Sequence, residues 1–464
     1  MTLNVAGLLA CNLLFLAAGS GLVRLLGGWR TPRGLLRTVG TAYLAGIAGV
    51  GVTLQLVLVL GAPFNRWVVI GVCAALGLSG LAAPHPVDPP TRAVRIPPFL
   101  RPAAIALVGI VVLMAVDLWF QPLGVFDAWA QWTAKARALV VFHGLDPDVL
   151  ASTPYRSWNP DYPLLVPSLE AADFTFMRRI DTRAIHVQFW LVYAGFLLAL
   201  LELLRGRVRE VLVWPFVLAI ALSPAVQIQT AAALADVPVG VLFALAGLFA
   251  WRWVVDADRL ALRLFPLFAA GAYATKFEGR IFVSALSVTM IALIAVTARA
   301  RLAATVVAAG VALVGLVPWS LWVSHHHVVG VFSTSLSERF GVDLIGKADR
   351  IPLILEALAR NVLDPSRWLL LGLVILASLV VAWSGAPNRV GVWLVVGTLV
   401  LSALGLVLVY WATPLELRLH LALSARRVVT GPTLFAITLV PLLLEAALRG
   451  RAHETRGSEY PLPP

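Results

Sequence analysis

The sequence contains little charge. Of its 464 residues only 13% are Asp, Glu, Lys or Arg, while 60% are hydrophobic; soluble domains contain about 25% charged residues. This balance excludes a soluble globular protein. Apolar runs of about 18 to 22 residues recur along the whole chain, and each is long enough to cross a hydrocarbon core of about 30 Å as a helix. The composition therefore indicates an integral membrane protein with an all-α bundle.

Cysteine is nearly absent. The two cysteines, Cys11 and Cys73, lie inside apolar runs, where a thiol behaves as a small hydrophobic side chain. No metal-ligand spacing accompanies them, so a disulfide scaffold and a cysteine metal centre are excluded. The N-terminus lacks a basic leader region, and we expect the first apolar run to be a retained span.

The chain also lacks a single basic patch, although its net charge is +12. Its basic residues occur singly or in short clusters between apolar runs. This distribution is typical of topology signals and of contacts with anionic membrane lipids, and it argues against nucleic acid as a partner.

Length and absence of charge predict about thirteen transmembrane helices. The expected spans are 4–23, 40–61, 67–84, 102–120, 186–204, 211–229, 237–255, 262–275, 281–298, 302–323, 367–384, 390–411 and 428–447. A Pro-rich stretch, 85–101, reads as a cytoplasmic linker because successive prolines cannot continue a helix. We therefore divide the chain into three N-terminal helices (1–84), this linker, a catalytic bundle (102–448) and a cytoplasmic tail (449–464).

Six arginine clusters, counted by spans, fall on one side of this bundle. They lie at 24–37, 92–101, 205–209, 252–263, 299–301 and 449–451. Because positive charge collects in short cytoplasmic loops, we expect the N-terminus outside the cytoplasmic (inner) membrane and the C-terminus inside. The extracytoplasmic segments are then 121–185, 230–236, 276–280, 324–366 and 413–427.

The first external loop, 121–185, has internal structure. Between Asp127 and Phe142 the apolar residues, Trp129 and Trp132 among them, recur at helical spacing opposite Gln131 and Lys135. This pattern predicts an amphipathic helix lying flat at headgroup level. Prolines at 160, 163 and 167 then indicate an extended path, and 169–179 reads as a second amphipathic piece.

Two external carboxylates are candidates for chemistry. Asp127 follows the fourth span and Asp236 begins the seventh. Each has an alternative interpretation as a helix cap, because Asp is a favoured capping residue. A carboxylate at the membrane edge is costly, however, and two of them in one cavity would supply a base and an orienting or metal-holding partner.

Further charges interrupt the chain on the same side. Lys276, Glu278 and Arg280 lie between two apolar runs, and Glu278 is difficult to explain as a snorkelling flank. His325 to His327 form an interfacial loop in our interpretation, because three adjacent histidines cannot bind one metal ion. The 324–366 loop contains Glu338, Arg339, Asp343, Lys347 and Arg350, charges that could shape an acceptor site, and the sequence does not choose among them.

The last external segment, 413–427, contains cations where the positive-inside rule disfavours them. Arg426 and Arg427 would offer planar guanidinium groups to phosphate oxygens. The alternative is an amphipathic interface helix, and the pattern itself does not choose between the two.

Five motifs in this order resemble the GT-C superfamily of polytopic bacterial glycosyltransferases, including protein O-mannosyltransferases and aminoarabinose transferases. They are Asp-x-Trp-x-x-Trp-x-x-Lys-Ala (127–136), Pro-Asp-Tyr-Pro-Leu-Leu (160–165), Ala-Asp-Val-Pro (235–238), Thr-Lys-x-Glu-Gly (275–279) and His-Leu-x-x-Ser-x-x-Arg (420–427). The resemblance covers about residues 120–430 and leaves out 1–100.

The resemblance implies a GT-C-like bundle that transfers a sugar from a polyprenyl-phosphate donor to an external glycan, lipid or protein acceptor. Asp127 would be the catalytic carboxylate and Asp236 the second acidic residue. The donor phosphate would face Lys276, His420, Arg426 and Arg427. Other substrate contacts would come from Trp129, Trp132, Lys135, Asp161, Tyr162 and Glu278.

One departure from the family pattern concerns metal. Several relatives have two adjacent acidic residues in the first loop, whereas Asp127 is followed by Ala128. The metal requirement is therefore open; if Mg²⁺ or Mn²⁺ is used, Asp127 and Asp236 are its candidate ligands.

Elementary chemistry leads to the same mechanism. A positioned carboxylate assists deprotonation of an acceptor hydroxyl by roughly 10²- to 10⁴-fold, and cations stabilise the departing phosphate. Attack opposite the phosphate would invert the anomeric centre. Two alternatives stay open: a ligase or polymerase of lipid-linked glycans, and a transporter or flippase, although no inverted repeat is evident.

Overall fold

The computed structural model describes residues 2–88, 96–331 and 345–458, and within these ranges the chain is all-helical. Its sole β pairing there is an isolated bridge between Arg205 and Val208. The predicted all-α class is confirmed. Glu338, Arg339 and Asp343 of the 324–366 loop lie outside the described residues.

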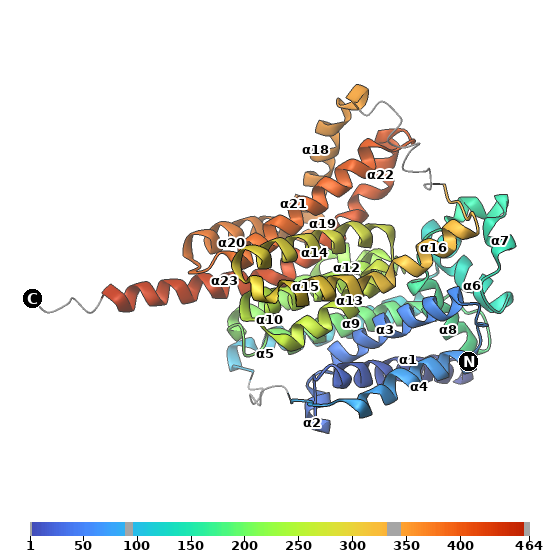
Figure 1. Ribbon diagram of the computed structural model, residues 1–464, viewed down its shortest axis with the longest axis horizontal. Coiled ribbons are helices and arrows are strands. Elements are labelled where there is room, and N and C mark those ends of the chain that lie inside the picture. Colours follow the sequence, from blue (N-terminus) through green and yellow to red (C-terminus); the bar gives the residue numbers. More distant parts are fainter. Residues whose placement is uncertain (1, 89–95, 332–344, 459–464) are drawn as a thin grey trace, which may run out of the picture.

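The helices are labelled in Figure 1 in the order in which they follow along the chain. Up to residue 231 they are α1 (Thr2–Leu25), α2 (Pro32–Leu36), α3 (Val39–Val59), α4 (Arg66–Ser79), α5 (Arg101–Phe120), the π-helical turn η3 (Asp127–Trp132), α6 (Thr133–Val141), α7 (Pro147–Ala151), η4 (Thr153–Trp158), α8 (Leu165–Met177), α9 (Ile185–Leu204), α10 (Glu210–Leu222) and α11 (Pro224–Ala231). After residue 231 they are α12 (Asp236–Asp256), α13 (Arg259–Tyr273), α14 (Phe277–Thr297), α15 (Leu302–Ala312), α16 (Val317–His325), α18 (Arg350–Leu363), α19 (Pro365–Trp368), α20 (Leu371–Gly385), α21 (Val390–Trp411), α22 (Leu417–Val428) and α23 (Thr430–Ser458).

Eight helical segments of the described chain are long and apolar enough to cross a membrane. They are Val5–Leu25, Val39–Val59, Pro98–Phe120, Ile185–Leu204, Asp236–Asp256, Phe277–Thr297, Val390–Trp411 and Leu417–Gly450. Two bent pairs, α10 with α11 (49°) and α15 with α16 (41°), raise the number to ten if each pair is one span. The count of thirteen is not confirmed, because Arg66–Ala82 and Leu371–Gly385 are shorter apolar helices and α13 has only 15 residues.

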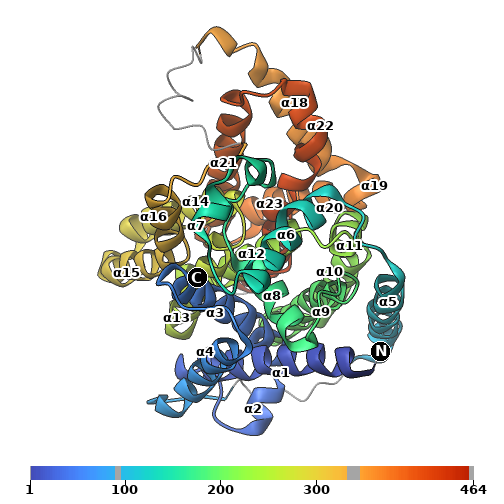
Figure 2. The ribbon, with the colours of Figure 1, turned by 90° about the vertical axis from the view of Figure 1, so that its right-hand side faces the viewer.

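Helix α12 occupies the centre of the bundle (Figure 2). Its whole apolar window is buried, and it packs against α13, α14 and α23. Phe243 of α12 stacks on Phe435 of α23 and on Phe282 of α14, with ring centroids 4.8 and 5.4 Å apart. Aromatic contacts of this kind stabilise the packing of neighbouring helices. They therefore help to hold the first residues of α12 and α14 beside one another.

The N-terminal helices pack directly on the rest of the bundle, along its lower side in Figure 1. Helix α3 contacts α8, α9 and α13 as well as α1. The Gln55 side chain accepts a hydrogen bond from Leu164 N (3.0 Å) and donates one to Gly315 O (3.1 Å). Helix α3 therefore supports the loop that precedes α8.

Helix α8 is a buried helix, although the sequence predicted an amphipathic piece at 169–179. Eleven of its residues are buried, including Glu170 and Asp173. Glu170 accepts a hydrogen bond from Thr133 Oγ1 of α6 (2.9 Å), and Asp173 accepts one from Asn12 Nδ2 of α1 (3.3 Å). The polar face exists, but α1 and α6 cover it.

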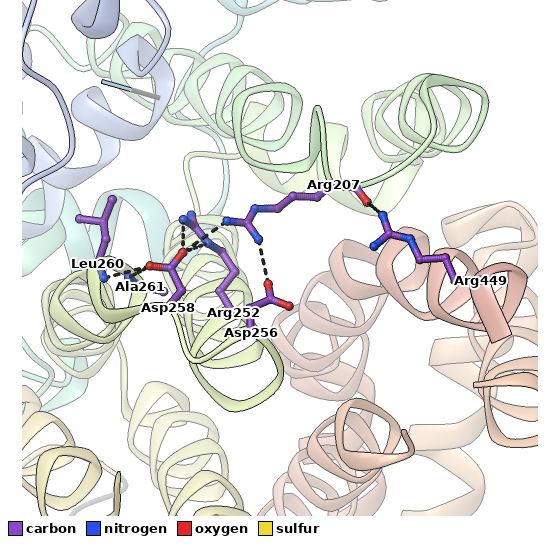
Figure 3. Close-up of polar contacts among 7 residues, drawn as sticks. All are labelled: Arg207, Arg252, Asp256, Asp258, Leu260, Ala261 and Arg449. Carbon is purple, nitrogen blue, oxygen red and sulfur yellow. Dashed lines mark hydrogen bonds and ion pairs between the residues drawn. The ribbon is translucent and has the colours of Figure 1, made fainter. Parts of the chain in front are cut away.

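Several predicted arginine clusters meet at one end of the bundle (Figure 3). Arg207 contacts Asp256 (2.8 Å) and Asp258 (3.3 Å), Arg252 contacts Asp258 (2.6 Å), and Arg449 donates to the Arg207 carbonyl (2.8 Å). Asp258 also caps α13 by accepting from its first amides. These contacts support a common side for these clusters. Which face of the bundle is cytoplasmic stays a prediction. Helix α23 continues as far as Ser458, into the predicted cytoplasmic tail.

Candidate functional site

Asp127 lies at the first residue of η3, directly after the loop that follows α5. Its side chain is 30% exposed and forms an ion pair with Arg427 Nη1 of α22, 300 positions away in the sequence. Arg427 lies in the last turn of α22. The structure therefore joins the loop 121–185 to the segment 413–427 through opposite charges.

Asp236 and Lys276 form a second, more deeply buried ion pair. Asp236 is the first residue of α12 and Lys276 precedes α14, and their side chains are 3% and 7% exposed. Lys276 Nζ lies 2.7 Å from Asp236 Oδ1 and 3.0 Å from Glu278 Oε1. Burial alone would lower the pKa of Lys276, but the two carboxylates outweigh burial and raise that pKa, so the amine stays protonated.

Gly279 lets the start of α14 pack close to α12 and α13, which places Lys276 beside Asp236. A Cβ atom at Gly279 would lie 2.1 Å from the carbonyl oxygen of Ala272 and 3.1 Å from Val239 Cγ2. No larger residue fits without moving backbone atoms of α13. The glycine of the Thr-Lys-x-Glu-Gly motif thus brings the start of α14 close to α12 and α13.

The two ion pairs belong to one group, which we call the charge cluster: Asp127, Asp236, Lys276, Glu278 and Arg427. Arg427 is close enough to Asp236, Glu278 and Lys276 to interact with each of them electrostatically. Three carboxylates and two cations give the cluster a formal charge of −1. Within the described part of the chain, Asp236 Oδ2, Glu278 Oε2 and Arg427 Nε have no hydrogen-bond partner. Buried polar atoms normally have partners, so these three indicate a place for a polar ligand.

Tyr162 closes one side of the charge cluster. Its ring lies 5.6 Å from that of Trp132 and 4.1 Å from that of Phe277, centroid to centroid. Burial raises the pKa of Tyr162 well above its ordinary range, and the nearby carboxylates of Glu278, Asp161 and Asp127 raise it further. The hydroxyl therefore keeps its proton and is available as a hydrogen-bond donor.

Lys135 holds the turn that carries Tyr162. Its side chain is buried, and Nζ donates hydrogen bonds to the carbonyls of Asn159 (3.3 Å) and Tyr162 (3.1 Å). Burial lowers the pKa of Lys135 to about 7, although Asp161 and Glu170 oppose that shift. Sequence reasoning placed Lys135 and Gln131 on a polar outer face, and both are buried. Lys135 lies where α6 packs on α8, and Gln131 of η3 accepts a hydrogen bond from Asn159 Nδ2 (3.1 Å).

Helix α22 presents a polar stripe toward the charge cluster. His420, Ser424 and Arg427 follow one another at helical spacing, so they share one face. His420 Nδ1 lies 2.9 Å from Thr413 Oγ1, and Ser424 Oγ lies 2.8 Å from the Tyr410 hydroxyl. Beside this stripe, Leu419 and Leu423 are 53% and 58% exposed. Arg427 therefore lies next to an exposed apolar surface of the same helix.

His420 lies on the polar stripe of α22, and the other predicted site residues divide into three groups. Asp127, Asp236, Lys276, Glu278 and Arg427 form the charge cluster, and Tyr162 borders it. Trp132, Lys135 and Asp161 are buried supports behind that border; Trp132 was expected at the membrane interface and instead faces the protein. Trp129, 48% exposed, and Arg426, exposed beside Arg367, lie at the surface.

Sequence reasoning missed two contributors. Tyr410 lies near the end of the apolar helix α21, and its hydroxyl contacts Ser424 Oγ. A hydroxyl at the end of an apolar run is the feature of the sequence that could have identified it. Arg280 received no site role in the sequence analysis, yet its guanidinium lies 4.4 Å from the centroid of the Phe277 ring and interacts electrostatically with Asp161.

The donor set of the charge cluster does not fit a divalent cation. No group of three or more His, Cys, Asp or Glu side chains within the described residues is placed to hold a metal ion. Asp127 and Asp236 each face a cation, and a metal ion there would meet Arg427 and Lys276 instead of free carboxylates. His326 packs against Trp322, with ring centroids 4.6 Å apart. We therefore derive no step through a metal.

Comparisons of the chain with protein-family models, with curated proteins and with solved structures find no match.

Proposed function

We propose that the chain is an inverting glycosyltransferase of the cytoplasmic membrane that moves a sugar from a polyprenyl-phosphate donor to an extracytoplasmic glycan, lipid or protein. The observation that supports this best is the charge cluster, which combines a partly exposed carboxylate with two cations at the ends of apolar helices. A lipid-linked phosphate lies at this depth in a bilayer, since its chain is in the hydrocarbon layer.

The apolar surface beside Arg427 supports a lipid-linked donor over a soluble one. Leu419 and Leu423 are exposed on α22, one helical face away from His420, Ser424 and Arg427. An isoprenoid chain along the leucines would place its phosphate near the arginine. Guanidinium groups bind phosphate oxygens through two parallel hydrogen bonds, and Arg427 Nε has no partner in the described chain.

Binding of the donor would also free the catalytic carboxylate. Asp127 is held by Arg427, and the pair is partly exposed, at 30% and 18%, so a ligand can reach it from one side. A donor phosphate competes with Asp127 for the guanidinium. Once released, Asp127 can accept a proton from an acceptor hydroxyl.

The transfer is then one balanced displacement. The acceptor oxygen forms a bond to the anomeric carbon while its proton moves to Asp127, and the bond from that carbon to the phosphate oxygen breaks. The electron pair leaves with the polyprenyl phosphate, whose charge Arg427 and Lys276 stabilise. Asp236 and Glu278 keep Lys276 protonated and in place. The anomeric configuration inverts.

Purified protein in nanodiscs tests the proposal. We would supply radiolabelled polyprenyl-monophosphate sugars with a membrane lipid extract and compare wild type, Asp127→Asn and the control Asp148→Asn, an exposed carboxylate on α7 of the same loop. We expect Asp127→Asn to lower turnover by about 10²- to 10⁴-fold and the control to retain it.

Three results would contradict the proposal. Turnover that survives Asp127→Asn would reduce Asp127 to a structural residue. A product that retains the donor's configuration would exclude single displacement. Movement of an intact sugar–phosphate across the membrane, without cleavage, would favour a transporter.

A further inference from the structure

A cavity of about 380 Å³ lies where the ends of α1, α5 and α9 meet, apart from the charge cluster. Its volume is in the range of small-ligand sites, about 300 to 1,000 Å³. Val5, Leu8 and Trp119 form one wall, and the loop 179–184 forms the other. In Figure 2 the N-terminus of α1 lies close to α5, at the edge of the bundle.

The loop wall is cationic. Arg179 and Arg183 line the cavity with Asp181, which gives a formal charge of +1. Asp181 organises the loop, because one carboxylate oxygen accepts from Arg179 Nη2 (2.7 Å) and the other from the backbone N–H of Arg183 (3.2 Å). The Arg183 side chain is exposed, and it forms no ion pair within the described residues.

The opposite wall is apolar and adjoins the surface that faces lipid. Helices α1, α5 and α9 each belong to a candidate span, and their ends at this cavity lie at one level. Only 17% of the apolar window of α5 is buried, and Ile105, Leu113 and Phe120 are 72%, 70% and 76% exposed. A cavity at the end of such a helix lies at headgroup depth, and Trp119 is a side chain typical of that depth.

We propose that this cavity binds the phosphodiester headgroup of an anionic membrane phospholipid. Arg179 and Arg183 contact the phosphate, and Val5, Leu8 and Trp119 contact the first carbons of the acyl chains. A free phosphate ion would use the arginines but gain nothing from the apolar wall, so the two walls together favour a lipid. This site does not depend on the proposed transferase activity.

The experiment measures lipid binding with the full chain in nanodiscs. Phosphatidylglycerol is titrated into phosphatidylcholine, and native mass spectrometry counts the anionic lipids that stay bound to wild type, Arg183→Gln, Val5→Trp and Arg178→Gln. Arg178 is a matched control because it is exposed, lies beside the loop and does not line the cavity. Val5→Trp fills the cavity without changing charge.

We expect wild type and Arg178→Gln to retain phosphatidylglycerol equally. Arg183→Gln should weaken retention about tenfold, the effect of one charge-assisted hydrogen bond, and Val5→Trp should abolish it. Equal losses in Arg183→Gln and Arg178→Gln would show diffuse surface attraction and overturn the proposal. Retention by Val5→Trp, or displacement of the lipid by millimolar inorganic phosphate, would overturn it as well.

Discussion

At the scale of single residues, Asp236 and Glu170 show two ways in which this chain buries a carboxylate. Asp236 has Lys276 at 2.7 Å, so its charge is balanced. Glu170 has Thr133 as its hydrogen-bond partner and no cation within salt-bridge distance among the described residues. Burial raises the pKa of Glu170 to about 8. The first residue is therefore ionised and the second is protonated at neutral pH.

Asp236→Asn should destabilise the protein, because it leaves the charge of Lys276 buried with Glu278 as its remaining partner. Breaking a buried ion pair costs about 3 kcal/mol or more. The control is Glu356→Gln, which breaks the pair with Arg360 on α18, where the side chains are 60% and 76% exposed; exposed pairs contribute about 0 to 1 kcal/mol. Thermal unfolding in detergent measures both, and equal melting temperatures for the two variants would contradict the prediction.

Glu170→Gln should change how stability depends on pH. In wild type, the pKa of Glu170 rises from its ordinary value of 4.5 in the unfolded chain to about 8 in the folded protein. Folding therefore takes up a proton between these values, and stability falls by up to about 1.4 kcal/mol per pH unit as pH rises through that window. The glutamine variant lacks this slope. Between pH 5 and pH 7.5 the melting temperature of wild type should therefore fall relative to that of Glu170→Gln; parallel curves would rule out a buried neutral acid.

Single residues of the charge cluster were predictable from the sequence, but their partners were not. Asp127, Asp236, Lys276 and Glu278 interrupt or border apolar runs, which is a local signal. The pairing of Asp127 with Arg427 spans 300 positions and depends on helix packing. Lys135 was misplaced for the same reason: its sequence neighbours do not show that α8 covers it.

At the scale of helices, periodicity indicated an amphipathic face but not what lies against it. Helix α8 has polar residues on one face, as expected, yet Glu170 and Asp173 contact Thr133 and Asn12 inside the bundle. The spacing of hydrophobic residues shows which face of a single helix is apolar, but it does not show which other helices pack against that helix. The cover supplied by α1, α3 and α6 is a tertiary property, and a buried polar face therefore looks like a surface face in the sequence.

Gly279→Ala should destabilise the junction between α13 and α14. The added methyl group would meet the Ala272 carbonyl oxygen at 2.1 Å, and overpacking of this kind costs about 1 to 3 kcal/mol. Gly310→Ala on α15 is the matched control, since a Cβ atom there meets nothing within 4 Å, and a helical Gly→Ala change gains about 0.5 to 1 kcal/mol. Melting temperatures should move in opposite directions. A shift of the same sign in both variants would show that the packing at Gly279 is not tight.

At the scale of the whole molecule, the sequence predicted a helical protein with many apolar helices, but not the number of spans. Hydropathy marks where a run is apolar; it does not show that α10 and α11 bend by 49° or that α15 and α16 bend by 41°. Short and broken helices were counted as full spans. The error in the number of spans does not change the position of the charge cluster. Asp127, Asp236 and Lys276 each lie at the start of a helix, at the same end of the bundle.

The predicted sidedness decides whether the charge cluster faces out of the cell, and thiol labelling tests it directly. The two native cysteines are buried, at 0% and 2% exposure, so wild type should not react with a membrane-impermeant maleimide. Ser157→Cys introduces an exposed thiol in the loop 121–185, and Asn388→Cys introduces one in the turn between α20 and α21. In sealed right-side-out vesicles Ser157→Cys should label at once and Asn388→Cys only after permeabilisation. The reverse pattern would place Asp127 in the cytoplasm, where a lipid-linked donor carried on the outer leaflet could not reach it.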